Sequence, residues 1–89
     1  MATVEFTPNL QRILDCPTGD HPGDTVRAVL EAAFASHPRV RSYVLDDQGS
    51  VRKHVVVFLN GAQVTDRRTL SDAVGPDDQL LVMQALSGG

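Results

Sequence analysis

The pattern of apolar and polar positions divides the chain into short strands and helices. From Ala2 to Phe6 the two kinds of residue alternate, with apolar side chains at Val4 and Phe6, and this is the period of a half-buried strand. The next apolar segment, residues 10–16, fits either a second strand or a short helical turn. Two Pro and two Gly within residues 17–24 then predict a loop.

The most regular pattern along the chain is helical. Between residues 25 and 37 the apolar side chains recur at the i, i+3, i+4, i+7 and i+8 positions, which places them on one stripe of an amphipathic helix. They are Val26, Val29, Leu30, Ala33 and Phe34. Asp24 or Thr25 is placed to cap this helix, and Pro38 ends it. Residues 39–47 fit a second short helix.

The second half of the chain reads as a hairpin and a final strand. Within residues 54–65 a β-branched and aromatic run meets Asn60 and Gly61, the preferred pair for a type I′ turn because both tolerate positive φ. Residues 66–78 form a polar connection. Residues 79–86 are almost continuously apolar, which predicts a central strand and fits one covered on both faces.

The order of these elements predicts the fold class. A strand, a second strand or helical turn, a helix, a hairpin and a last strand indicate an α+β protein, a roll of the β-grasp type. One main helix packs on one face of a mixed sheet, and the ends of the chain lie in neighbouring strands. The 89 residues suffice for one domain with a small core. We expect residues 1–86 to form this domain and residues 87–89 to form a flexible C-terminal Gly-Gly tail.

Composition narrows the functional class. A formal net charge of −3 disfavours nucleic-acid binding, which needs clustered Lys and Arg. Cys16 is the single cysteine, so no internal disulfide is possible; this fits a reducing cytoplasm, and we expect Cys16 to be a small apolar filler. The sequence contains no signal peptide and no apolar run long enough for a bilayer, which predicts a cytoplasmic protein without a membrane partner.

Local signatures of catalysis are missing from the sequence. There is no phosphate-binding loop and no dinucleotide-binding glycine motif. His21, His37 and His54 lack the short spacing of a zinc site, and we interpret them as ordinary surface or loop residues. Asp46 and Asp47 begin a segment too short for a calcium loop. We therefore expect no metal or cofactor bound by this chain and no enzymatic activity of the chain alone.

The candidate reactive group lies at the end of the chain, where Ser87, Gly88 and Gly89 follow the last predicted strand. Glycine has no Cβ, so a partner can close tightly around the backbone. The terminal carboxylate is ionised at neutral pH and is a poor acyl donor until it attacks the α-phosphate of ATP. A sulfur nucleophile or an amine can then displace AMP. In such a scheme this chain supplies the shape and the carboxylate of Gly89, and a partner supplies ATP, magnesium and the catalytic groups.

A candidate partner-binding surface follows from strand periodicity. If Val55 and Val57 face the core, their neighbours on the same strand point outward, and the same logic applies to the last strand. The predicted exposed apolar patch consists of Val56, Phe58, Leu81 and Met83. Such patches often mark partner surfaces. The alternatives are a loop that covers this face, or a reversed assignment. Arg67 and Arg68 either flank the patch and attract an acidic partner or belong to a solvated loop.

Three segments together carry a resemblance to a known family. They are GDTVRAVLEAAFASHPRVRSYVLDDQG at residues 23–49, VVVFLNG at residues 55–61 and DDQLLVMQALSGG at residues 77–89. In this order, over almost the whole chain, they resemble the ubiquitin-like small sulfur-carrier proteins. That family includes the molybdopterin synthase small subunit, the thiamine-pathway carrier and a carrier used in cysteine biosynthesis.

The resemblance implies a function. Gly89 would be adenylated by an activating enzyme and converted to a thiocarboxylate, with a sulfur donor enzyme and a sulfur-accepting synthase as further partners. The long stretch between helix and hairpin is more similar to the molybdopterin and cysteine carriers. Ser87 before the Gly pair, Gln84 where the family often has Pro, and Val56 where it often has a polar residue leave the pathway open. Two alternatives are a protein modifier joined to lysines through Gly89 and a plain β-grasp interaction domain.

Overall fold

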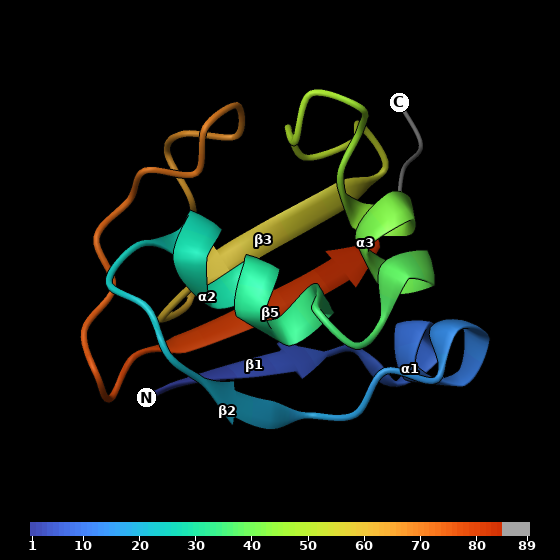
Figure 1. Ribbon diagram of the computed structural model, residues 1–89, viewed down its shortest axis with the longest axis horizontal. Coiled ribbons are helices and arrows are strands. Elements are labelled where there is room, and N and C mark those ends of the chain that lie inside the picture. The colour runs from blue at the N-terminus through green and yellow to red at the C-terminus, as the bar shows by residue number, and fades with distance from the viewer. Residues whose placement is uncertain (85–89) are drawn as a thin grey trace.

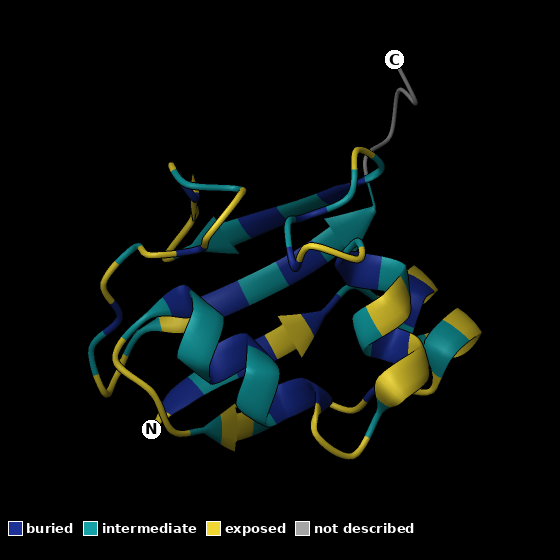
Figure 2. Ribbon diagram, turned by 45° about the horizontal axis from the view of Figure 1, so that its top comes forward, coloured by how far each residue is buried: buried dark blue, intermediate teal, exposed yellow. Residues whose placement is uncertain are grey.

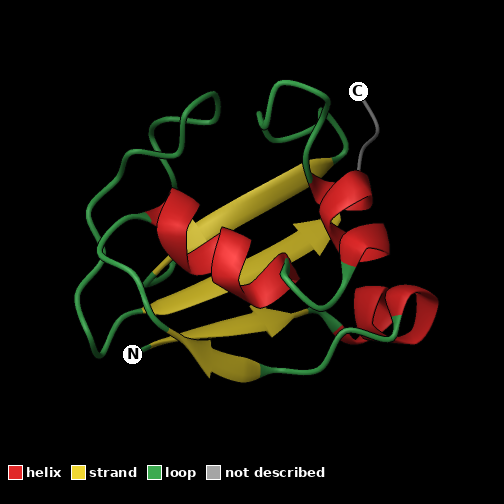
Figure 3. Cartoon of the chain, viewed as in Figure 1, coloured by secondary structure: helices red, strands yellow, loops and turns green. Residues whose placement is uncertain are grey.

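In the part of the chain that the structure describes, five strands form one mixed sheet, and three helices stand between its first and third strands in the sequence (Figure 1). The computed structural model describes residues 1–84. The elements in chain order are β1 (Ala2–Phe6), α1 (Pro8–Leu14), β2 (Gly19–His21), α2 (Val26–Phe34), α3 (Pro38–Val44), β3 (Val55–Leu59), β4 (Ala62–Gln63) and β5 (Gln79–Gln84). This arrangement is the predicted α+β fold, with a helix across one face of a mixed sheet (Figure 3).

The strand order is β2-β1-β5-β3-β4, so β5 occupies the centre. β5 runs parallel to β1, with Thr3 opposite Gln79, and antiparallel to β3, with Val55 opposite Gln84. The first and last strands are therefore neighbours, as the sequence predicts. Because of these directions, the start of β3 and the end of β5 lie at the same end of the sheet.

One face of the sheet carries the core. α2 lies across this face, and α3 packs beside it (Figure 1). Thr25 begins α2 as its N-cap, since its Oγ1 accepts a hydrogen bond from the backbone N–H of Ala28 at 3.1 Å. The strands and helices contribute fully buried side chains to one cluster. Among them are Leu10, Val26, Val29, Leu30, Val55, Val57, Leu80 and Val82. Figure 2 shows buried segments on both the strands and the helices.

The hairpin confirms its sequence prediction. Asn60 has φ 51° and Gly61 has φ 86°, the two positive values that a type I′ turn requires. β3 and β4 pair on either side of this turn. The second short helix is also present as α3, and residues 66–78 contain no named strand or helix.

The structure resolves one alternative and corrects two predictions. Residues 10–16 fall mainly in the helix α1, which starts at Pro8 in a position where proline tolerates its missing N–H. The predicted loop at residues 17–24 contains β2, a three-residue edge strand paired with β1. β5 is central but is not covered on both faces, because its side chains alternate between buried and partly exposed. None of the helices within residues 1–84 is long and apolar enough to cross a lipid bilayer.

Candidate functional site

The face of the sheet opposite α2 presents an apolar stripe. On β3, Val55 and Val57 are fully buried whereas Val56 and Phe58 are partly exposed. On β5, Leu80 and Val82 are buried, and the residues between and after them are partly exposed. Strand pairing sets Val56 opposite Met83 and Phe58 opposite Leu81. The described structure therefore brings together the four residues of the expected patch. Their role in binding a partner stays a prediction.

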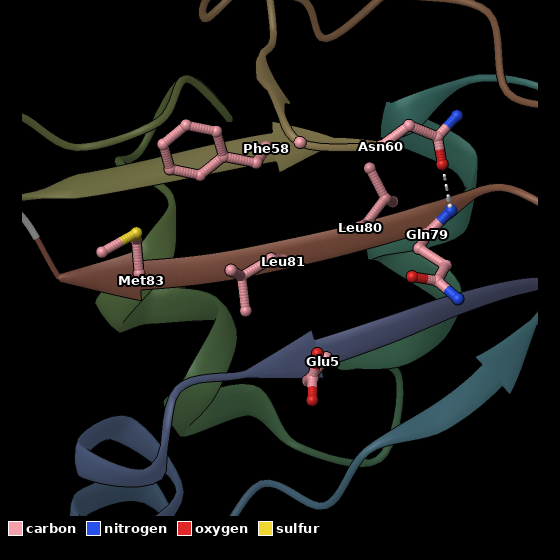
Figure 4. Close-up of a pocket in the computed structure, with 8 residues that line it drawn as sticks. Glu5, Phe58, Asn60, Gln79, Leu80, Leu81 and Met83 are labelled. Atoms are coloured by element: carbon pink, nitrogen blue, oxygen red, sulfur yellow. Dashed lines mark hydrogen bonds between the residues drawn. The ribbon is translucent and has the colours of Figure 1, made fainter.

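The stripe borders an open groove of about 400 Å³ (Figure 4). Its lining residues come from β1, β3, β5 and the hairpin turn, and they are Glu5, Phe58, Asn60, Gly61, Gln79, Leu80, Leu81 and Met83. Figure 4 shows Phe58, Leu81 and Met83 side by side on neighbouring strands. Leu81 lies between two register partners, Phe58 on β3 and Glu5 on β1. The groove thus offers apolar contact on one side and a carboxylate on the other.

One end of the groove is fixed by the side chain of Asn60. Its Oδ1 accepts a hydrogen bond from the backbone N–H of Gln79 at 2.9 Å, and its Nδ2 donates to Oδ1 of Asp78 at 3.0 Å (Figure 4 shows the first bond). The Asp78 carboxylate also accepts from the N–H of Gly75 at 2.7 Å. These bonds, the one from Gly75 first, hold the pKa of the Asp78 carboxyl below its usual range. The hairpin turn is thereby tied to the start of β5.

Acidic residues flank the groove on the side of β1 and β2. Glu5 is exposed beside Leu81, and Asp20 on β2 accepts a hydrogen bond from the Thr3 hydroxyl at 2.7 Å. Arg68 is exposed in the loop that follows β4, whereas Arg67 in the same loop is partly buried and its guanidinium donates to the carbonyls of Arg52 and Val55 at 2.8 Å each. It secures the segment that leads into β3.

The end of the described chain is attached to α1. The Nδ2 of Asn9 donates to Oε1 of Gln84 at 3.0 Å, and the N–H of Thr7 donates to the carbonyl of Val82 at 3.2 Å. The last described residue of β5 therefore has a side-chain contact with the first turn of α1. Ser87, Gly88 and Gly89 lie outside the described residues, so the predicted boundary between domain and tail stays a prediction.

Sequence reasoning missed three contributors to this site. Glu5 sits at an outward position of β1, and the alternation of residues 2–6 was a signal that could have found it. The sequence predicts Asn60 only as a turn residue, although its side-chain amide also donates a hydrogen bond to Asp78. Asn9 gave no signal, because its contact with Gln84 joins residues 75 positions apart.

Cys16, His21 and His37 line one small cavity that is separate from the groove. Cys16 is buried, as expected, and its Sγ lies 3.7 Å from the carbonyl oxygen of Leu10. Burial raises the pKa of this thiol. His21 and His37 line the same small cavity of about 110 Å³ although they are distant in sequence. Across residues 1–84, no group of three or more His, Cys, Asp or Glu side chains is placed to hold a metal ion.

The fold defines a class: a small ubiquitin-like protein with a β-grasp sheet. The chain belongs to the ThiS family, which it matches over residues 11–89. Members of this family are small carrier and modifier proteins rather than enzymes.

Known relatives agree with this membership. The chain is 34% identical over 71 residues to small archaeal modifier protein 1 of Haloferax volcanii, covering 79% of this chain and 77% of the relative. A crystal structure of that protein, named SAMP1, has a TM-score of 0.76 at 27% identity and covers 99% of this chain and 98% of that one. CysO in the Amycolatopsis orientalis BexX/CysO complex has a TM-score of 0.82 over the full length of both chains, and at 19% identity it supports the fold alone.

Proposed function

We propose that this protein is a cytoplasmic sulfur carrier whose C-terminal Gly89 is adenylated and then converted to a thiocarboxylate. The observation that carries the proposal is the family match, which extends through Gly88 and Gly89. A carrier of this kind contributes shape and a carboxylate, while ATP, magnesium and the catalytic groups belong to its partners. The proposed partners are an activating enzyme, a sulfur donor enzyme and a sulfur-accepting synthase in cofactor or cysteine biosynthesis.

The proposed chemistry has three steps. A carboxylate oxygen of Gly89 attacks the α-phosphorus of ATP, pyrophosphate leaves, and an acyl-adenylate forms. A sulfur nucleophile from the donor then attacks the acyl carbon, the bond from that carbon to the phosphate oxygen breaks, and AMP leaves. Where the nucleophile is the outer sulfur of a persulfide on the donor, the product is an acyl disulfide. A second thiol of the donor then attacks the donor's own sulfur, the S–S bond breaks, and the thiocarboxylate leaves while the two donor sulfurs form a disulfide. No step requires a catalytic side chain from this protein.

The apolar stripe is the proposed docking surface for the activating enzyme. Phe58 and Leu81 are register partners, partly exposed, on the side of the sheet that α2 leaves open. Removal of large apolar side chains in such a position from water by a partner makes the free energy of binding more favourable. The likeness to CysO, whose structure is that of a complex with BexX, supports the idea that a protein of this fold works through a bound partner.

The intact mass of the protein from its own host cells tests the proposal. Replacement of one terminal oxygen by sulfur gives a resolvable mass increment, and fragmentation should place it on Gly89. A chain without Gly88 and Gly89 should lack the increment while it keeps the same folded structure. If the purified activating enzyme and ATP form no adenylate on the full chain, the sulfur-carrier proposal is wrong.

A second candidate function is protein modification through the same activated carboxylate. The observation that favours it is the 34% identity to a protein named small archaeal modifier protein 1. Here the amine of a target lysine, instead of sulfur, displaces AMP and forms an isopeptide bond. Conjugates of higher mass that carry this chain in host lysate, and that vanish when Gly88 and Gly89 are removed, would support modification. Detection of a thiocarboxylate without such conjugates would support the sulfur-carrier function and contradict protein modification.

A further inference from the structure

The open face of the sheet, opposite α2, differs in chemistry from one side to the other. β3 and β5 contribute the apolar stripe to this face. On β1 the buried residues alternate with Thr3 and Glu5, which point to the open face, and Glu5 is exposed. The Thr3 hydroxyl donates to Oδ1 of Asp20 at 2.7 Å, so Asp20 of β2 shares the face. The face therefore changes from apolar at β3 to acidic at β1 and β2.

Glu5 lies next to the centre of the apolar stripe. Strand pairing sets Glu5 opposite Leu81 and Leu81 opposite Phe58, so the three residues form one row across β1, β5 and β3. Paired strands are about 5 Å apart, which is the separation between the backbones of Glu5 and Leu81. Glu5 also lines the groove, and Figure 4 shows it on the β1 side of Leu81. A partner that covers Phe58 and Leu81 thus meets the Glu5 carboxylate as well.

No basic side chain of the described structure pairs with Glu5. The two ion pairs found within residues 1–84 both belong to Glu31 of α2, with Arg27 and Arg41, and α2 covers the other face of the sheet. None of the outward positions on β1, β3 and β5 holds a lysine or an arginine. Burial of an unpaired charge costs free energy, so a partner that covers the stripe has to supply the cation that pairs with Glu5.

Basic residues lie beyond the opposite border of the stripe, at the outer edge of β3. The loop after β4 follows this edge, because the N–H of Val64 donates to the carbonyl of Val57 at 3.0 Å. Val55 directs its carbonyl to the same edge, where the guanidinium of Arg67 donates to it at 2.8 Å. The next residue, Arg68, is exposed. Two arginines thus lie in the loop that borders the start of β3.

These two arginines have no carboxylate partner within residues 1–84. Asp66 precedes them, but its carboxylate accepts hydrogen bonds from the hydroxyls of Thr69 and Ser71 in its own loop. A guanidinium group stays protonated in proteins, so the positive charge persists at any pH at which the chain is folded. The apolar stripe is therefore bordered by carboxylates on the β1 side and by arginines beyond β3.

We propose that these charges fix the orientation in which the activating enzyme docks on the apolar stripe. A basic side chain of the enzyme meets Glu5, an apolar side chain covers Phe58 and Leu81, and an acidic side chain meets Arg68. The inference rests on the proposed function and adds the chemistry of the contact surface on the enzyme. That surface is apolar at its centre, basic on one side and acidic on the other.

Charge, rather than apolar contact, selects the orientation. Burial of apolar surface is non-directional, so the stripe alone also permits docking after a half-turn about an axis perpendicular to the sheet. That half-turn exchanges the β1 side with the β3 side and brings like charges together, which is unfavourable. The same half-turn exchanges the two ends of β5. The charge pattern therefore decides which end of β5 faces the catalytic centre of the enzyme.

The first test measures the rate of association between the full-length chain and the purified activating enzyme in the absence of ATP. Glu5→Lys and Arg68→Glu should each lower the association rate constant about tenfold at about 0.05 M salt, because charges at the border of an interface act mainly on this constant. The double variant keeps the net charge of −3 and should lose more than either single variant. At about 1 M salt the Debye length falls to about 3 Å, so all variants should approach the wild type.

The matched control makes the same charge changes on the side of the sheet that the helices cover. It combines Asp47→Lys with Arg39→Glu, two exposed residues. Asp47 belongs to a turn whose Gly49 carbonyl accepts a hydrogen bond from Arg27 of α2 at 2.6 Å, and Arg39 lies on α3 beside α2. This control should associate at the wild-type rate at both salt concentrations. Urea unfolding of every variant checks that the fold is retained.

The second test reads the orientation from photo-crosslinkers placed one at a time at Lys53 and Gln63. Both residues are exposed, Lys53 just before the start of β3 and Gln63 on β4, opposite Phe58 near the other end. In a single orientation each position should link to one segment of the enzyme, and the two segments should differ. Docking in both orientations would link both positions to both segments, which would overturn the inference.

Three further results would contradict the inference. They are no association of the wild type, equal association rates for the wild type and the Glu5→Lys, Arg68→Glu double variant at low salt, and an equal loss in the matched control. A different result would refute the sulfur-carrier proposal alone: a wild-type chain that associates with the expected dependence on charge but yields no adenylate on Gly89 when ATP is added. The docking orientation would then stand without the proposed chemistry.

Discussion

The amide of Asn60 and the carboxylate of Asp78 meet at 3.0 Å, which ties the hairpin turn to the residue before β5. The same Asn60 side chain accepts the N–H of Gln79, and its backbone takes the left-handed conformation with φ 51°. One residue thereby shapes the turn and holds the end of the groove. Asparagine suits both tasks, because it tolerates positive φ and carries a donor and an acceptor.

Two substitutions at Asn60 separate its tasks. Asn60→Gly keeps the turn geometry and removes two exposed hydrogen bonds, so it should lower the free energy of unfolding by about 1 kcal/mol. Asn60→Ala also forces a side chain with a Cβ into positive φ, and we expect about 1 kcal/mol more. Urea unfolding measures both values. Equal losses for the two variants would show that backbone conformation contributes nothing here.

The apolar stripe gives a prediction about partner binding. Phe58→Ser and Leu81→Ser should each weaken binding to the purified activating enzyme by about 2 kcal/mol, roughly thirtyfold, if these side chains fill the centre of the interface. Both side chains face away from the core, so urea unfolding should change little. The matched control is Ile13→Ser on α1, an apolar residue that is 52% exposed but lies off the stripe. An equal effect of Ile13→Ser would refute the assignment of the stripe.

The sequence predicted those parts of the fold that a local pattern encodes. Val26 to Phe34 show the helical period, and Asn60 with Gly61 shows the turn, because both depend on residues near one another in the chain. β2 escaped prediction since three residues between Pro17 and Pro22 become a strand only through pairing with β1. Glu5 could be assigned to the outer face from its strand period, but its position beside Leu81 depends on the parallel register of β1 and β5. Contacts of this kind are set by tertiary structure.

The hydrogen bonds accepted by the Asp66 carboxylate lead to a prediction of how the free energy of unfolding depends on pH. It accepts hydrogen bonds from the N–H groups of Arg68, Thr69 and Ser71 and from the hydroxyls of Thr69 and Ser71. These bonds, with the Thr69 hydroxyl first, hold the pKa of Asp66 far below its usual range. A carboxyl group whose pKa is lowered by folding stabilises the protein above its unfolded pKa of about 4, and this stabilisation is lost as the pH falls through the folded value.

Asp66→Asn should therefore unfold at a lower temperature than the wild type at pH 7, and the difference should shrink as the pH is lowered below about 4. Thermal unfolding followed by circular dichroism at several pH values measures this. Asp77→Asn serves as the control, because Asp77 is an exposed carboxylate without a hydrogen bond to any other residue in the range 1–84. A difference between wild type and Asp66→Asn that stays constant with pH would contradict the role of the Asp66 charge.

Gly23 and Gly61 both have positive φ, but replacement by alanine should lower the free energy of unfolding by different amounts at the two positions. Gly23 has φ 146°, and a Cβ built there would lie 2.8 Å from both the Cβ of Ala28 and the backbone nitrogen of Val29. Gly61 has φ 86°, and a Cβ there would meet nothing within 4 Å. Alanine at Gly61 costs only the unfavourable backbone conformation, about 1 kcal/mol. Alanine at Gly23 adds a clash with the first turn of α2, which must shift because the contact includes backbone.

We therefore expect Gly23→Ala to lower the free energy of unfolding by at least about 2 kcal/mol more than Gly61→Ala, since overpacking typically costs about 1–3 kcal/mol. Urea unfolding of both variants gives the comparison, with the unfolding slope as a check that the unfolded states are alike. The loop before α2 also carries its cap, Thr25, so the larger loss should accompany reduced helical circular dichroism in Gly23→Ala alone. Similar losses for the two variants would mean that the loop relaxes around the added methyl group and that close packing at Gly23 does not fix the start of α2.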